Sequence, residues 1–323
     1  MNVMAEARQV EGRSARQSLS LDGVWQFRHE DGAWREAHVP APWQAEFRDL
    51  VDTSGRAVYK RSFSVPAGWE GRELALKFGA VSYYCEVFLN GERLGEHEGA
   101  YLPFEFVLPA RLLKSSNEVE VRVVMPSADH RLYPDFPFSE VPHGKMSWYG
   151  RIGGLWQSVS LEARDARHVT DLVITAGMDG VAHVSLAFSD AAKGLRARVS
   201  VMDNGGEVVA EGSVEAGEKA ELSLAVPGAR LWSVDTPNLY RLMVDLGEGV
   251  DVVTQNFGFR TVETRDGKIL LNGEPVYMRG ALDQDYYPQG IYTAPSLEFL
   301  EDQARKAKEL GQIGRAVQQE CRD

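Results

Sequence analysis

The chain has 323 residues, of which 44% are hydrophobic and 25% are charged, and its formal net charge is −12. This length allows two or three domains with hydrophobic cores. The acidic balance argues against nucleic acid or an anionic membrane surface as the main partner, and no segment approaches the roughly 18 consecutive apolar residues of a membrane-spanning helix.

The N-terminal residues 1–18 are polar and contain no apolar core of a secretory signal peptide. They predict a flexible lead-in, and we expect a cytoplasmic protein. The two cysteines, Cys85 and Cys321, lack the spacing of metal ligands. Cys85 lies in an apolar run, which predicts a buried free thiol.

Residues 19–163 consist of short β-branched or aromatic runs that are separated by Gly, Pro, Asn or Asp: GVWQF, AVYKRSFSV, GRELALKFG, YYCEVFLNGERLGEH and NEVEVRVVM. Asn90-Gly91 predicts a tight hairpin, because both residues adopt positive φ readily. Many short strands without helices between them predict a jelly roll or sandwich. The long connection 126–157 is expected to be functional or to cover the core.

Residues 164–262 form a second all-β stretch, with turns every eight to twelve residues and a hairpin signal, DNGG, at 203–206. This spacing is typical of an immunoglobulin-like sandwich.

The pattern changes in residues 263–312. A short strand, an Asn272-Gly273 turn and an apolar strand from Val276 are predicted, followed by an amphipathic helix at 296–310 that ends at Gly311. A strand followed by a helix is the unit of a parallel α/β domain, so a third domain begins here.

Several motifs in this order resemble glycoside hydrolase family 2, the family of β-galactosidases, β-glucuronidases and β-mannosidases. The resemblance extends from Leu19 to Gly311 and is carried by LDGVWQF, VPAPWQ, FLNGERLGEHEGAYLPFEF, WYGRIGGLWQSVSLE, LWSVDTPNLY, FGFRTVE and ILLNGEPVYMRGALDQDYYP. It implies a galactose-binding-like jelly roll, an immunoglobulin-like sandwich and a (β/α)₈ catalytic barrel, of which only the first β/α unit is present.

The resemblance also implies an activity. Family members are retaining β-glycosidases that use two glutamates on later barrel strands, one as acid/base and one as nucleophile. Neither position exists in this sequence, so the chain itself is expected to be inactive. The resemblance implies a carbohydrate substrate for the complete protein and allows a homo-oligomer. We expect no cofactor, and the spacing of residues supports no metal site, although a Ca²⁺ or Mg²⁺ site made of loop oxygens stays open as an alternative.

Candidate substrate-binding residues follow the first barrel strand, because active sites of such barrels lie at the C-terminal ends of the strands. Arg279-Gly280 precedes Asp283, Gln284 and Asp285. Family members often have His and Glu where Gln284 and Asp285 stand, which argues against a straightforward assignment to the β-galactosidase or β-glucuronidase branch. The alternative is that these polar residues only face solvent.

Trp148 and Tyr149 lie at the end of the long connection and are candidates for stacking on a sugar. A role in anchoring the connection remains the alternative. Trp156 is expected to point into the core.

The last residues, 313–323, show no pattern of an element. They can be encoded by a DNA string that resembles a widely used sequencing adapter, which predicts a non-native tail after Gln312; an ordinary disordered tail is the alternative.

A non-catalytic carbohydrate-binding or architectural module is the alternative to the enzyme hypothesis.

Overall fold

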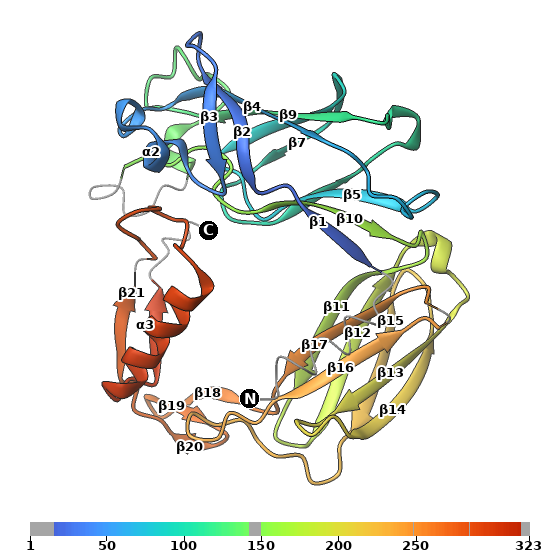
Figure 1. Cartoon of the computed structure of the whole chain (residues 1–323). Helices are drawn as coiled ribbons and strands as arrows, with labels where there is room; N and C mark the ends of the chain where they lie inside the picture. The colour runs from blue at the N-terminus through green and yellow to red at the C-terminus, as the bar shows by residue number, and fades with distance from the viewer. Residues whose placement is uncertain (1–15, 142–149, 248, 284, 318–323) are drawn as a thin grey trace. The chain divides into compact units, whose positions relative to one another are not determined.

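A computed structural model of the chain describes residues 16–141, 150–247, 249–283 and 285–317 (Figure 1). Their contacts divide them into two compact units. One unit contains residues 18–162 and 279–317, and the other contains residues 16–17 and 163–278. Each unit is described by itself.

The first unit contains two facing β-sheets, and the predicted jelly roll is confirmed. The larger sheet has the order β3-β2-β4-β9-β6-β7 and the smaller one the order β1-β10-β5-β8. The strands are β1 (Gln17–Ser20), β2 (Gly23–His29), β3 (Arg35–Val39), β4 (Gly55–Phe63), β5 (Glu73–Phe78), β6 (Tyr84–Leu89), β7 (Glu92–Glu98), β8 (Phe104–Val107), β9 (Asn117–Met125) and β10 (Val159–Arg164). Short helices lie between strands: α2 (Trp43–Glu46), η1 (Arg48–Leu50), η2 (Ala110–Leu112) and η3 (Phe138–Glu140).

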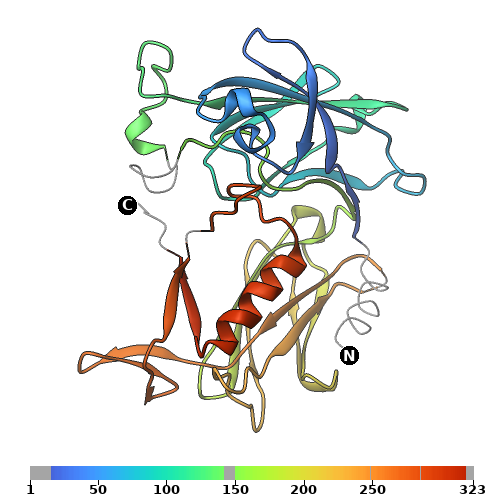
Figure 2. The same cartoon turned by 60° about the vertical axis from the view of Figure 1, so that its left-hand side comes forward.

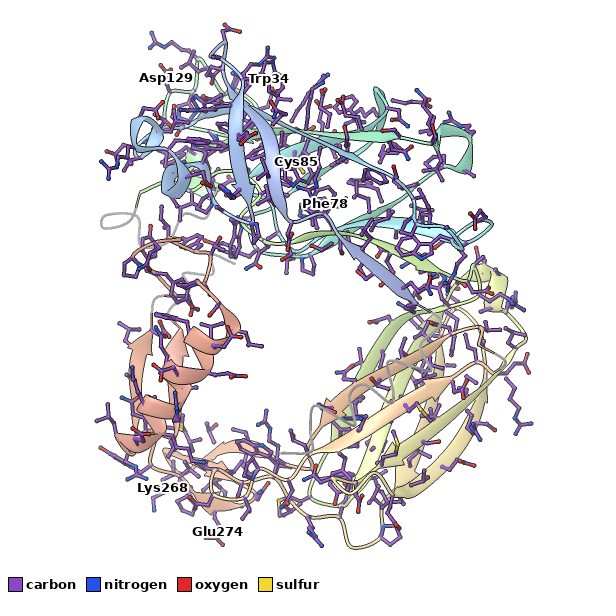
Figure 3. All side chains as sticks on the ribbon, viewed as in Figure 1. Trp34, Phe78, Cys85, Asp129, Lys268 and Glu274 are labelled. Atoms are coloured by element: carbon purple, nitrogen blue, oxygen red, sulfur yellow. The ribbon has the colours of Figure 1, made fainter. Side chains whose placement is uncertain are left out.

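Alternation of side chains explains how these strands form a core. In β9 every second residue, from Asn117 to Met125, is buried, whereas the residues between them face outward. The Asn90-Gly91 hairpin joins β6 to β7 with both φ angles positive, as predicted. Cys85 on β6 is a buried free thiol, as predicted, and Figure 3 labels it together with Phe78 of β5.

The second unit contains an immunoglobulin-like sandwich, as predicted. Its sheets have the orders β11-β12-β15 and β14-β13-β16-β17. The strands are β11 (Val169–Ala176), β12 (Val181–Phe188), β13 (Arg196–Met202), β14 (Val208–Glu215), β15 (Ala220–Ala225), β16 (Tyr240–Asp245) and β17 (Val252–Phe257), and η4 (Asp190–Ala192) follows β12. Buried aliphatic residues of both sheets, with Phe188, Tyr240 and Phe259, form one core.

A small sheet, β18 (Val262–Arg265), β19 (Lys268–Leu271) and β20 (Glu274–Pro275), follows the sandwich; Figure 3 labels Lys268 and Glu274 on it. The predicted turn is present, since Asn272 and Gly273 both have positive φ. The strand predicted from Val276 is wrong. The amide of Val276 donates to Ile269, but Tyr277 and Met278 are exposed, and the next strand, β21, begins only at Gly280.

The chain then forms a β-α-β unit. Strand β21 (Gly280–Asp283) leads through a loop to helix α3 (Leu297–Glu309), and β22 (Gly314–Val317) pairs parallel to β21. The Ser296 hydroxyl accepts a hydrogen bond from the Phe299 amide at the start of α3, and Gly311 has a φ of +75° just after its end.

Three differences from the expected boundaries stand out. Strand β1 begins at Gln17, inside the segment expected as lead-in. The segment expected as a third domain is divided between the two units after Met278. No element was expected after Gly311, yet β22 lies there. A parallel strand pairs through its backbone, so four residues without alternating polarity still form one.

None of the helices among the described residues has the length and apolar character needed to cross a membrane.

Candidate functional site

The candidate site is built on the C-terminal end of β21. Asp283 is the last residue of the strand, and its carboxylate Oδ1 accepts a hydrogen bond from the amide of Asp285 at 2.9 Å. Asp285 has a φ of +49°, a conformation that Asn and Asp tolerate better than most residues. This bond joins the two predicted residues, and both are half-buried. The other three predicted residues, Gln284, Trp148 and Tyr149, lie outside the described residues.

Tyrosine side chains extend the site along the loop that joins β21 to α3. The hydroxyl of Tyr287 lies 3.5 Å from Oδ1 of Asp285, and its ring packs against Phe299 of α3 at 5.9 Å between centroids. Two backbone hydrogen bonds between Tyr287 and Ile291, of 2.7 and 3.0 Å, close the loop. The loop is therefore a compact element whose carboxylates and rings are fixed relative to each other.

The tip of this loop contacts the jelly roll. The ring of Tyr292 lies 5.8 Å from that of Tyr101, 5.6 Å from that of Trp156 and 5.3 Å from that of Tyr286. The hydroxyl of Tyr101 donates to that of Tyr292 at 3.1 Å, across 191 residues of sequence. We call Tyr101, Trp156, Tyr286 and Tyr292 the aromatic cluster.

Trp156 is buried, as predicted, but it lies before the strand β10 rather than within a strand. Its indole Nε1 donates to the carbonyl of Ala100 at 2.8 Å, and its carbonyl accepts from the Thr293 hydroxyl at 2.6 Å. Sequence reasoning missed Tyr101, Tyr292 and Thr293. The density of tyrosines in DQDYYPQGIY was a signal for this loop, whereas nothing local pointed to Tyr101.

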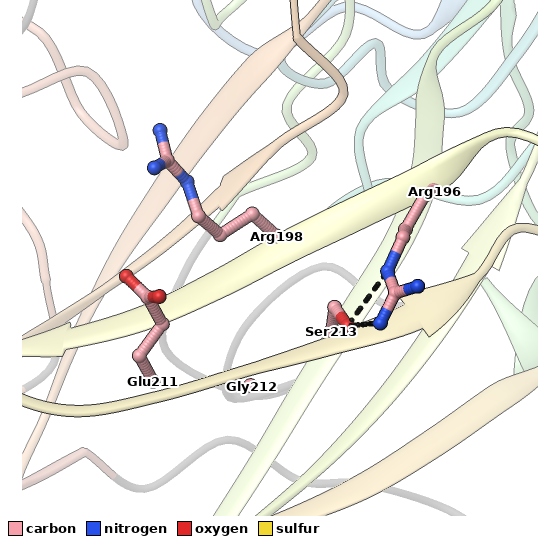
Figure 4. Close-up of a pocket in the computed structure, with 5 residues that line it drawn as sticks. All are labelled: Arg196, Arg198, Glu211, Gly212 and Ser213. Atoms are coloured by element: carbon pink, nitrogen blue, oxygen red, sulfur yellow. Dashed lines mark hydrogen bonds between the residues drawn. The ribbon is translucent and has the colours of Figure 1, made fainter.

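A surface pocket lies in the second unit (Figure 4). It lies on β13 and β14 and is lined by Arg196, Arg198, Glu211, Gly212 and Ser213. Arg196 donates to the Ser213 hydroxyl through Nε at 2.9 Å, and Arg198 pairs with Asp245 at 3.4 Å. Both guanidinium groups are thus engaged with neighbouring side chains of the open sheet face, and the pocket carries no catalytic arrangement.

Among the residues that the structure describes, no three His, Cys, Asp or Glu side chains gather closely enough to hold a metal ion. The side chains at the strand end are carboxylates, which accept hydrogen bonds from hydroxyl groups, and aromatic rings, whose faces suit the apolar side of a pyranose.

The described residues thus form two β-sandwiches and, after them in the chain, a β-α-β unit with carboxylates at the end of its first strand. The model described as Glycosyl hydrolases family 2, sugar binding domain, matches residues 13–163, and the model described as Glycosyl hydrolases family 2 matches residues 167–260. The chain belongs to glycosyl hydrolases family 2.

Similar proteins include a β-galactosidase from Thermoanaerobacter pseudethanolicus, which is 30% identical over 242 residues, 71% of this chain and 32% of the relative. A β-glucuronidase from Streptococcus agalactiae is 26% identical over 82% of this chain and 47% of the relative. The structure of a β-glucuronidase from Bifidobacterium dentium in complex with coumarin-3-O-glucuronide has a TM-score of 0.75 at 24% identity, covering 90% of this chain and 55% of that one. The chain thus spans between about a third and just over half of these proteins.

Proposed function

We propose that this chain is the N-terminal portion of a retaining exo-β-glycosidase, similar to β-galactosidases, whose complete form hydrolyses terminal β-linked sugars. The observation that carries the proposal is the placement of Asp283 and Asp285 at the C-terminal end of β21, after two sandwiches that match family 2. In a (β/α)₈ barrel this end of the strands faces the substrate.

The chemistry of such an enzyme needs two carboxyl groups about 5–5.5 Å apart, one that protonates the leaving oxygen and one that attacks the anomeric carbon. We assign neither role to a residue of this chain, because the family's glutamates lie on later strands. The carboxylates of Asp283 and Asp285 would instead accept hydrogen bonds from sugar hydroxyls, and the side-chain amide of Gln284 would donate or accept them. The chain alone should therefore show no turnover.

The two carboxylates also favour a neutral sugar. Hydroxyl groups of a galactose-like sugar can donate to Asp283 and Asp285, whereas a uronate would bring a third negative charge into the same turn. This argument supports a β-galactoside over a β-glucuronide, although relatives with both names match the chain.

The test is to recover the gene beyond codon 312 from the source DNA and to assay its product on nitrophenyl β-galactoside, β-glucuronide and β-mannoside. We expect hydrolysis of the galactoside and none by the 323-residue chain. Asp283→Asn and Asp285→Asn should raise KM, whereas Glu301→Gln, which changes an exposed carboxylate of α3, should not. An inactive product, or a reading frame that ends at Asp323, would overturn the proposal.

A non-catalytic glycan-binding module is the second candidate, favoured by the description of the family model that matches residues 13–163. In the connection between β2 and β3, Trp34 is 41% exposed, with the guanidinium of Arg28 over its ring at 4.9 Å (Figure 3 labels Trp34). Binding of glycans by the 323-residue chain, with no activity of any longer product, would select this candidate.

A further inference from the structure

We propose that the jelly roll positions the substrate-binding turn of Asp283 and Asp285 through the aromatic cluster and the bond from Thr293 to Trp156. The inference rests on the proposed function, because it assigns these contacts a role in holding the turn where a sugar would bind.

The jelly-roll side of this contact is a rigid support. Trp156 is only 9% exposed, and its indole nitrogen is held by the carbonyl of Ala100. Tyr101 follows Ala100 directly, and its ring meets that of Trp156 edge-on at 5.9 Å between centroids. The position of Tyr101, whose hydroxyl donates to Tyr292 of the loop, is thus held by Ala100 on one side and by the buried ring of Trp156 on the other.

The loop side is equally compact. Gly290 approaches the carbonyl of Thr293 so closely that a Cβ at this glycine would lie 2.0 Å from that oxygen. The Tyr287–Ile291 pairing closes the same loop. Tyr286, the residue after Asp285, packs its ring against that of Tyr292. A displacement of Tyr292 would therefore be transmitted to the carboxylates.

The strand and the helix of the β-α-β unit provide little support of their own. Helix α3 has no buried residue, and strand β21 is exposed from Gly280 to Leu282. The loop, in contrast, contains the buried Tyr287 and the two hydrogen bonds that span 191 and 137 residues of sequence. Figures 1 and 2 show this loop beside the jelly roll, just before the start of α3. In the 323-residue chain, the position of the turn thus depends on the loop contacts.

The first measurement uses the 323-residue chain. Hydrogen exchange of the amides of Asp285, Tyr287 and Ile291 reports the order of the loop, because all three amides donate within it. Tyr292→Ala should speed their exchange about tenfold or more and leave the β9 amides unchanged. Tyr277→Ala, which removes an exposed tyrosine outside the cluster, is the matched control and should change neither.

The second measurement uses the product of the gene recovered beyond codon 312. Tyr101→Phe and Tyr292→Phe each remove one hydroxyl of the same hydrogen bond, so each should raise KM about three- to tenfold with a smaller change in kcat. The double variant should be no worse than either single variant, because the bond is already lost. Thr293→Val should raise KM likewise, and Thr293→Ser should restore it.

The outcomes separate the two proposals. An active enzyme whose KM is unchanged in the Tyr292→Phe and Thr293→Val variants overturns the positioning role, even if these variants are less stable. An inactive product overturns the proposed function. In that case the exchange data decide alone, and equal protection of the loop amides in Tyr292→Ala and the control overturns the ordering of the loop by the cluster.

Discussion

We expect the ion pair between Arg16 and Asp251 to contribute strongly to the stability of the second unit, and its removal tests this expectation. The Asp251 side chain is fully buried, and the Arg16 side chain is 20% exposed. The carboxylate of Asp251 accepts hydrogen bonds from Nε and Nη2 of Arg16 and from the amide of Val169, each at 2.8 Å. Arg16 also donates a hydrogen bond to the carbonyl of Val169 at 2.7 Å. The pair thus ties the segment before β1 to the start of β11.

We expect Asp251→Ala to lower the free energy of unfolding of this unit by about 3 kcal/mol. Removal of one partner from a buried pair costs about 3–5 kcal/mol. The lower end applies here because water reaches the partly exposed guanidinium of Arg16 and can solvate it once the carboxylate is gone. At 1.4 kcal/mol per factor of ten, this loss corresponds to roughly a hundredfold faster exchange of amides that open only on global unfolding.

The assay is hydrogen exchange of the β13 and β16 amides, since it reports on this unit alone. Arg198→Ala is the matched control, because Arg198 pairs with Asp245 at 3.4 Å on the surface of the same unit. Surface pairs contribute about 0–1 kcal/mol, so the control should change exchange less than about fivefold. In a double-mutant cycle of Arg16→Ala and Asp251→Ala, a coupling energy below about 0.5 kcal/mol would refute the reasoning.

Three further predictions concern the jelly roll. Gly153→Ala should destabilise it by about 2 kcal/mol in urea unfolding, because the new Cβ would lie 2.3 Å from the buried ring of Trp43. In a Cys321→Ser background, the thiol of Cys85 should react with a thiol reagent at pH 8 at least roughly a hundredfold more slowly than free cysteine, because burial raises its pKa to about 12. The pKa of His97 is lowered, chiefly by burial. The imidazole of His97 is therefore protonated more readily in the unfolded chain than in the folded one. The free energy of unfolding should fall as the pH drops through 6.5, and it should fall less steeply in His97→Gln.

Each of these predictions has its own control. Gly150→Ala places a Cβ in open space and should change stability by less than about 0.5 kcal/mol, so equal losses in both glycine variants would contradict the steric argument. Fast labelling of Cys85 under native conditions would mean that β6 opens far more readily than its burial implies. For His97, identical pH profiles of the two proteins between pH 7 and 5 would rule out its contribution.

Local signals in the sequence were sufficient wherever neighbouring residues determine the structure. Asn90-Gly91 and Asn272-Gly273 specify hairpin turns because both residues of each pair accept positive φ. Gly311 ends α3 because the amides of Gly311 and Gln312 return to the carbonyls of Lys308 and Ala307. The alternating polarity of the strands likewise predicted both sandwiches.

The sequence could not predict features that depend on distant residues. The strand expected from Val276 begins four residues later, at Gly280, because an apolar run indicates burial, whereas Tyr277 is 84% exposed. The contact between Tyr101 and Tyr292 joins segments 191 residues apart, and neither position differs locally from an ordinary core or loop tyrosine. In the candidate site, the family resemblance pointed to the carboxylates after the strand, but the rings that contact their loop were not predicted.

The exposure of α3 has a consequence for the order of the β-α-β unit. A helix of 13 residues is marginal in water by itself, even with a Ser296 cap and a glycine after its end. Leu297 and Leu310 of its apolar stripe are 63% and 79% exposed, so packing adds little stability along its length. Near its N-terminal end, the ring of Phe299 contacts that of Tyr287 in the loop. The helix therefore depends on the loop, and the loop depends on the jelly roll, so a change at Tyr101 should loosen α3 without touching it.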